Sequence, residues 1–332
     1  MNTKIIAILF ALFAAIFYAV NVPLSKILLQ NINPSFMASL LYLGAGFGMM
    51  ILALINRENM KGSDALTKSD LPFVTGMIVL DIAAPILLMT GITYGTSSNA
   101  SLLGNFEIAA TTIIAMLIFH ESVSKRLWLA LILITLSGII LTFEGTNSFK
   151  FSYGSVFVLM AASCWGLENN CTRKISSKNA YEIVILKGIF SGTGSLMIAF
   201  LSGENVPGLY DSMCALVLGF IAYGLSIFFY VKAQNVLGAA KTSAYYAAAP
   251  FIGVILSFIL LHEKISESFV IALVIMIAGS VLAVIDTLIL SHSHEHTHVI
   301  THTHGGTKHT HIITHSHIHN HYISGENHRH IH

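Results

Sequence analysis

The chain has 332 residues, of which 55% are hydrophobic and only 10% are charged, and its formal net charge is +1. Soluble globular domains carry about 25% charged residues. Together with a mean hydropathy of +0.74, this composition excludes an ordinary soluble protein and is typical of a chain embedded in lipid.

Ten apolar stretches approach or reach the roughly 20 residues that a helix needs to cross a bilayer. The connections between them are short, so no soluble domain fits between neighbouring spans. The sequence therefore predicts an all-α membrane protein with ten transmembrane helices. The predicted spans are Ile5–Leu28, Phe36–Ile55, Pro72–Ile92, Ala100–Phe119, Leu127–Phe143, Ser155–Cys171, Ile183–Leu201, Met213–Val231, Thr242–Leu261 and Phe269–Leu290.

Lysines and arginines are distributed unequally between the two sides of these spans. If the N-terminus is cytoplasmic, eleven of them lie on the inner side before the tail, and only Lys26, Lys150 and Lys264 lie on the outer side. Cytoplasmic loops carry the excess of positive residues. This asymmetry predicts a multi-pass protein with both termini in the cytoplasm.

Two stretches of equal length resemble each other. Ala100–Glu121 reads ASLLGNFEIAATTIIAMLIFHE, and Thr242–Glu263 reads TSAYYAAAPFIGVILSFILLHE. Because five spans is an odd number, the second half must cross the membrane in the opposite sense to the first, as in the inverted repeats of secondary transporters. The predicted organisation is a first repeat over residues 1–145, a second over 146–290 and a tail over 291–332.

Three prolines lie inside predicted spans: Pro23, Pro85 and Pro250. An interior proline frees a backbone carbonyl and kinks the helix, which membrane proteins tolerate beside a cavity. The prolines are therefore candidate kinks that line a cavity, and simple packing kinks are the alternative.

Glu107 stands in an otherwise apolar span, with Gly104 and Thr111 on its helical face and Asn105 beside it. A carboxylate at a helix centre costs about 2.5–3.5 kcal/mol on insertion scales, so it usually faces a cavity and is functional. We expect Glu107 to carry a proton or to bind a cationic group. The alternative is a protonated glutamate that neighbouring helices satisfy.

Asp81 and Glu168 are the other acids within spans, and Lys187 is either a partner for one of them or a side chain that snorkels to the interface. Solvation near the cytoplasmic end is the alternative for Glu168. Tyr245 and Tyr246 can line a pocket for an organic molecule. The predicted substrate and coupling site comprises Asp81, Asn105, Glu107, Thr111, Glu168, Tyr245 and Tyr246.

The tail contains 15 of the 17 histidines, which recur at every second residue over long stretches. It has no apolar face, so it is predicted to be a disordered cytoplasmic segment. Neutral imidazole binds Zn²⁺, Ni²⁺, Co²⁺ and Cu²⁺, so weak metal binding is expected, with incidental affinity as the alternative. The candidate ligands are His292, His294, His296, His298, His302, His304, His309, His311, His315, His317, His319 and His321.

Enzyme motifs are missing from the sequence. Ser124 and Ser266 occupy the places of the second histidine in an H-E-x-x-H zinc motif after the two His-Glu pairs, and no G-x-x-x-x-G-K-[ST] phosphate loop is present. The His-Glu pairs are interpreted as helix-end corners, each glutamate bonded to its own loop. Neither an enzyme nor a required cofactor is expected.

The chain resembles the EamA family of the drug/metabolite transporter superfamily over roughly Ile5–Ile289. The resemblance rests on the ten predicted spans in two inverted repeats, on the ending PFIGVILSFILLHE at Pro250–Glu263, and on the IAG of Ile277–Gly279. The first copy departs from that pattern, with Glu107-Ile108 where a proline is common. LLGNFEIAATTIIAMLIFHE and CWGLENNCTRKIS look like a branch of the family with histidine-rich ends. The resemblance implies a carrier in the plasma (inner) membrane.

We therefore expect a secondary transporter of small metabolites or drugs, an exporter working by alternating access around a central cavity. The alternative is a carrier of divalent Zn, Co or Ni, with the tail collecting or sensing metal. Expected partners are the lipid bilayer and a small-molecule substrate, with protons as the candidate coupling ion and a homodimer as the candidate assembly. No nucleic acid partner is expected.

Overall fold

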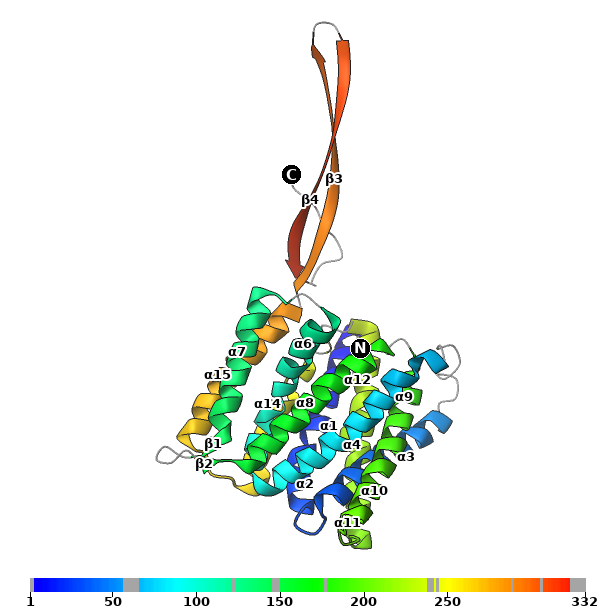
Figure 1. Ribbon diagram of the computed structural model, residues 1–332, viewed down its shortest axis with the longest axis vertical. Helices are drawn as coiled ribbons and strands as arrows, with labels where there is room; N and C mark the ends of the chain where they lie inside the picture. Colours follow the sequence, from blue (N-terminus) through cyan, green and yellow to red (C-terminus); the bar gives the residue numbers. More distant parts are fainter. Residues whose placement is uncertain are drawn as a thin grey trace.

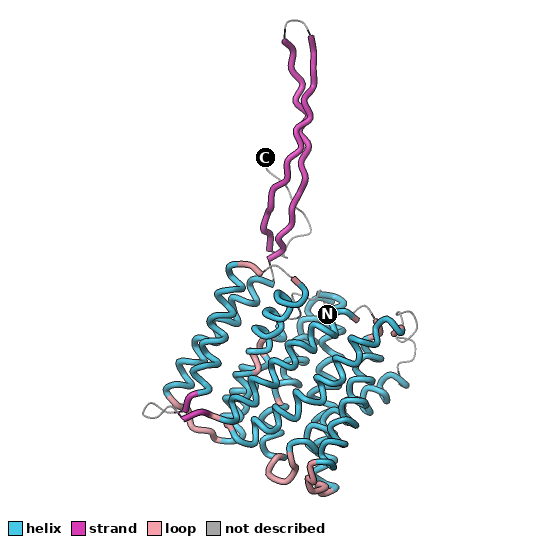
Figure 2. Tube along the Cα trace, viewed as in Figure 1, coloured by secondary structure: helices cyan, strands magenta, loops and turns pink. Residues whose placement is uncertain are grey.

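The computed structural model describes residues 3–55, 66–120, 123–144, 150–175, 178–237, 242, 245–287, 289–304 and 307–322. These residues form a bundle of helices with one long β-hairpin projecting from an end of the bundle (Figures 1 and 2). The N-terminal end of the first helix and the base of the hairpin lie at the same end (Figure 1).

The regular structure in the first half of the described chain consists of seven α-helices, one 3-10 turn and one short strand. A 3-10 turn, Lys68–Asp70, precedes α4, and α7 ends in the strand β1 (Phe143–Glu144), which pairs antiparallel with β2 (Lys150–Phe151). The helices are α1 (Thr3–Ala19), α2 (Asn21–Leu28), α3 (Pro34–Ile55), α4 (Leu71–Tyr94), α5 (Ser97–Leu103), α6 (Phe106–Phe119) and α7 (Lys125–Thr142).

The second half contains two π-helical segments, η3 (Lys187–Ser191) and η4 (Phe220–Leu225), each continuous with the α-helices on both sides. π segments of this kind are frequent at functional sites. The α-helices are α8 (Tyr153–Lys174), α9 (Ala180–Leu186), α10 (Gly192–Leu201), α11 (Leu209–Gly219), α12 (Ser226–Leu237), α14 (Ala249–Leu261) and α15 (Glu267–Thr287).

Eight helical stretches of the described chain are long and apolar enough to cross a membrane. They correspond to eight of the ten predicted spans. The predicted ninth span contains the shorter apolar helix α14. The sixth coincides with α8, which is 22 residues long but carries polar residues near its end, among them Glu168 and Asn169. A multi-pass membrane protein is confirmed, whereas the count of ten spans stays a prediction.

Two predicted spans are interrupted by turns. The first is broken between α1 and α2, with Pro23 in the first turn of α2, and the fourth is broken at Gly104 and Asn105, between α5 and α6. Pro85 lies inside α4, which continues on both sides of it. Pro250 differs from its predicted interior position, because it lies in the first turn of α14, where the missing N–H removes no helical hydrogen bond.

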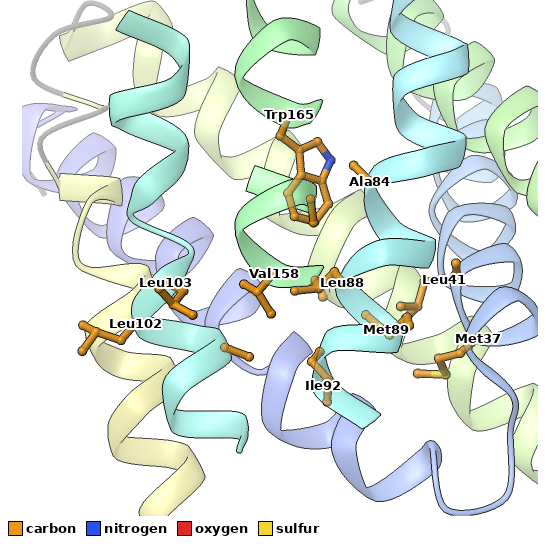
Figure 3. Close-up of a cluster of buried hydrophobic side chains, with 14 of the residues drawn as sticks. Met37, Leu41, Ala84, Leu88, Met89, Ile92, Leu102, Leu103, Val158 and Trp165 are labelled. Atoms are coloured by element: carbon orange, nitrogen blue, oxygen red, sulfur yellow. The ribbon is translucent and has the colours of Figure 1, made fainter. Parts of the chain in front are cut away.

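The core lies where α3, α4, α5 and α8 meet. Buried side chains from these helices face one another, and Trp165 of α8 points toward Ala84 of α4 (Figure 3). Lower in the same view, Leu88 and Ile92 of α4 approach Val158 of α8. This packing fixes the rotation of α4 and α8 relative to each other, and it thereby decides which polar side chains of the two helices meet.

Glycines allow the backbone of α3 to contact the segment that begins at Lys187. A Cβ added at Gly188 would lie 2.5 Å from the Gly46 Cα, and one added at Gly46 would lie 2.8 Å from the Ile189 backbone N. Small residues at such crossings let membrane helices pack closely.

We therefore expect Gly188→Ala to lower the melting temperature of the detergent-solubilised protein by several degrees, because backbone atoms on α3 cannot move aside as a side chain can. Overpacking a filled site usually costs about 1–3 kcal/mol. Gly138→Ala is the matched control, since its new methyl group would meet only side-chain carbons at 3.6–3.8 Å. Equal melting temperatures for both variants would contradict the close crossing.

The described tail is a two-stranded antiparallel hairpin, β3 (Ile289–His304) and β4 (Thr307–Tyr322), with Ile289 opposite Tyr322 and His304 opposite Thr307. The prediction of a tail without regular structure is therefore wrong for these residues. Threonine, isoleucine and histidine alternate with the two-residue period of a strand, and β-branched residues favour strands. The structure describes the backbone of these strands, so the predicted metal ligands stay a prediction.

Candidate functional site

An ion-pair group joins α4, α8 and η3. The Lys187 Nζ atom lies 3.1 Å from Oδ2 of Asp81 and 2.9 Å from Oε1 of Glu168. Asp81 is 0% exposed and Glu168 is 2% exposed, whereas the Lys187 side chain is 18% exposed. Buried charges persist in proteins when they are paired. Lys187 is thus the partner of both acids rather than a side chain that snorkels.

Tyr42, Trp165 and Thr172 complete the hydrogen bonding around this group. The Tyr42 hydroxyl donates to Oδ1 of Asp81 at 3.0 Å, and Nε1 of Trp165 donates to the Tyr42 hydroxyl at 3.5 Å. The Thr172 hydroxyl donates to Oε1 of Glu168. Tyr42 is not among the predicted site residues, because its only sequence signal is a phenol among the small residues of an apolar, glycine-rich span.

Glu107 belongs to a second polar group, between α6 and α8. Its Oε1 accepts a hydrogen bond from Nδ2 of Asn169 at 2.6 Å, and the same nitrogen lies 3.3 Å from Oγ1 of Thr111. Asn170 donates to the backbone carbonyl of Thr111 at 3.0 Å. Glu107 and Thr111 therefore share one amide partner, and Glu107 remains only partly buried.

Of the other predicted site residues, Tyr246 packs among the tyrosine rings, Asn105 is buried in a turn, and Tyr245 is exposed. Tyr246 packs within the bundle, with its ring centroid 5.7 Å from that of Tyr18 and the two ring planes inclined at 45°. Asn105 is buried, and its amide lies 3.4 Å from the carbonyl oxygen of Leu102, so it stabilises the turn between α5 and α6. Tyr245 is 36% exposed and shows no contact with the acids.

A row of tyrosine rings passes beside the acids. The ring centroids of Tyr42 and Tyr223 are 5.3 Å apart, and those of Tyr223 and Tyr18 are 6.0 Å apart. Nδ2 of Asn21 donates to the Tyr223 hydroxyl at 3.0 Å. Tyr18 and Asn21 are not among the predicted site residues; they come from the first span, where Tyr18 lies between the buried Ala15 and Ala19, and Asn21 follows two residues after Ala19.

These groups contain more negative than positive charge. Asp81, Glu107 and Glu168 supply three carboxylates and Lys187 supplies one ammonium group. Such an excess can be neutralised by protons or by a bound cation. Among the residues that the structure describes, no cluster of three or more histidine, cysteine, aspartate or glutamate side chains is placed to hold a metal ion.

The two His-Glu corners have the same backbone geometry. α6 ends at His120 with φ 55° and α14 ends at His262 with φ 51°, both in the left-handed region. The carboxylate of Glu263 accepts hydrogen bonds from the backbone N–H groups of Ser97 at 2.6 Å and Ser98 at 2.8 Å. Its predicted bond to its own loop is thus wrong, because it caps α5 instead. Glu121 lies outside the described residues.

Known proteins with similar sequences are transporters. The chain is 27% identical over 284 residues to an uncharacterized transporter of Methanothermobacter thermautotrophicus, an alignment that covers 80% of this chain and 82% of the relative. It is 23% identical over 264 residues to the uncharacterized transporter YyaM of Bacillus subtilis, covering 74% of this chain and 82% of that protein.

A solved structure has the same fold, with a TM-score of 0.61 over 83% of this chain and 95% of that one, at 15% identity. The family model described as the EamA-like transporter family matches the chain twice, over residues 5–143 and 152–285. These two segments cover most of the helical bundle. The chain therefore belongs to the EamA-like transporter family.

Proposed function

We propose that this membrane transporter exports a small metabolite or drug by secondary active transport, with alternating access between two inverted five-span repeats, residues 1–145 and 146–290. The two family matches and the two left-handed His-Glu corners support the repeat. In this proposal the protein lies in the plasma membrane with both termini in the cytoplasm, and a homodimer is its candidate assembly.

The observation that carries the mechanism is the excess of carboxylates over ammonium groups inside the bundle. Lys187 pairs with Asp81 and Glu168, whereas Glu107 has an amide partner in Asn169 and no ion pair within the described chain. A carboxyl group in a low-dielectric site exchanges a proton readily when its surroundings change. Glu107 is therefore our candidate for the group that couples substrate movement to protons.

Glu107→Gln is expected to abolish proton-driven flux in reconstituted vesicles while the protein still folds, because glutamine retains the shape and the Asn169 contact but cannot ionise. The measurement is solute uptake driven by an imposed pH gradient, with melting temperature as the check on folding. Thr112→Val is the control, since Thr112 bonds only to the Ile108 carbonyl of its own helix among the described residues. Flux in Glu107→Gln equal to that of the wild type would contradict the coupling role.

Transport of divalent metal is the alternative function, and the alternating histidines of the tail favour it. Amino acids, other metabolites and Zn²⁺, Co²⁺ and Ni²⁺ can be compared in the same vesicles. Movement of metals alone, lost with residues 291–332, would favour the metal carrier over the metabolite exporter. Neither the metal carrier nor the metabolite exporter requires a cofactor in this proposal. If the protein exports metabolites, metal binding by the tail takes no part in their transport.

A further inference from the structure

Four tyrosine rings form a row beside the acids. The rings of Tyr42, Tyr223, Tyr18 and Tyr246 follow one another with centroid distances of 5.3, 6.0 and 5.7 Å. They come from α3, η4, α1 and the residues before α14, which are separate parts of the chain. No local sequence feature requires four phenol rings to meet, so their meeting calls for an explanation from the interior of the bundle.

Tyr18 lies on the inward face of α1. On α1, Phe13 and Ile16 are exposed on the outer face, whereas Ala11, Ala14 and Ala15 are fully buried. Tyr18 lies three, four and seven residues after these alanines, so it shares their inward face. It is nevertheless only partly buried, and its hydroxyl makes no hydrogen bond with the residues that the structure describes.

Glu107 brings a charge to the same place. One of its carboxylate oxygens accepts the Asn169 amide, and the other accepts no hydrogen bond from the described chain. Asn169, which holds Glu107, lies four residues after Trp165 on α8, and Trp165 donates to the hydroxyl of Tyr42, the first ring of the row, so the carboxylate lies on the side of α8 that faces the rings. Aromatic faces beside a carboxylate are the arrangement that proteins use to bind ammonium groups.

We propose that the substrate is a small organic cation, an amine or quaternary ammonium compound, held between the rings of Tyr18, Tyr223 and Tyr246 and the carboxylate of Glu107. This inference rests on the transport function proposed above and names its substrate class. An anion is disfavoured because carboxylates outnumber ammonium groups here. Lys187 cannot bind an anionic substrate without giving up the ion pairs that it already forms with Asp81 and Glu168.

Binding can be measured by calorimetry on the full chain in lipid nanodiscs, with choline and phenethylammonium as probes. Each probe is compared with its neutral isostere, in which carbon replaces the charged nitrogen. We expect each cation to bind at least tenfold more tightly than its isostere, in keeping with a desolvated cation–π contact. Equal binding of cations and isosteres, or tighter binding of zwitterionic phenylalanine than of phenethylammonium, would overturn the inference.

Variants test the two halves of the site separately. Tyr246→Leu and Glu107→Gln should each weaken cation binding about tenfold, whereas Tyr18→Phe keeps the ring and should change it less than threefold. Tyr210→Leu is the matched control, because Tyr210 is 80% exposed at the start of α11. Equal weakening by Tyr210→Leu would overturn the assignment.

If other metabolites move in vesicles while no cation binds, the inference fails alone, whereas absence of all flux would refute the transport function.

Discussion

Replacing Lys187 with methionine is expected to remove most of the folded protein from detergent extracts. The substitution leaves Asp81 and Glu168 buried without their shared ammonium group, at 0% and 2% exposure. Removing one partner of a buried ion pair typically costs about 3–5 kcal/mol, because an uncompensated charge remains. The measurement is the monodisperse fraction in size-exclusion chromatography, together with the melting temperature.

Recovery of folding can identify charge as the cause. Adding Asp81→Asn and Glu168→Gln to Lys187→Met removes all three charges and should restore much of the melting temperature, since neutral groups of the same shape need no counter-charge. Lys232→Met is the control, because Lys232 is exposed and lies over the Phe228 ring at 4.6 Å. A Lys187→Met protein as stable as the wild type would show that the two acids are already neutral.

The acids of the site could be predicted from the sequence, because charge within an apolar span is costly and therefore conspicuous. Asp81, Glu107 and Glu168 were identified in this way, and Lys187 was identified as a candidate partner. Which acids Lys187 pairs with could not be predicted. The pairing depends on the relative rotation of α4 and α8 and on the π segment at Lys187, which tertiary contacts decide.

The aromatic part of the site was largely beyond sequence reasoning. Tyrosine is ordinary both in membrane-interface belts and in pockets, so the residue type alone distinguishes neither role. Tyr246 was predicted to line a pocket and joins the tyrosine row, but its neighbour Tyr245 points elsewhere. The turn at Gly104 and Asn105 also escaped prediction, because the apolar run continues through it and hydropathy does not report a break.

The end of the bundle remote from the N-terminus and the hairpin is held by two charged contacts. α2 and the start of α15 lie at that end (Figure 1). There Nζ of Lys26 donates to the carbonyl oxygens of Ile92 at 2.5 Å and Gly95 at 2.8 Å, after which the chain enters α5. Glu263 binds the first N–H groups of α5. The Lys26 contacts lie within the first half, whereas the Glu263 contact joins the first half to the second, and a transporter that opens this end between the halves must break it.

Glu263→Gln is therefore expected to shift the protein toward a state open at that end. Hydrogen bonds to a charged group contribute about 1.5–3 kcal/mol, so their loss changes the populations of closed and open states at least tenfold. A cysteine introduced at Ser257, which is buried and bonded to Ser97, reports the change in a background without Cys164, Cys171 and Cys214. Its labelling by a membrane-impermeant maleimide should accelerate about tenfold in the Glu263→Gln variant.

The matched control is Glu267→Gln, which removes the charge of an exposed glutamate in the first turn of α15, four residues further on. It should leave the labelling rate unchanged, because Glu267 caps neither α5 nor any segment of the first half in the described structure. If both substitutions accelerate labelling equally, general loosening of this end explains the result. If neither does, the Glu263 contact does not hold this end closed, and closure then depends on the apolar packing of α5 against α14.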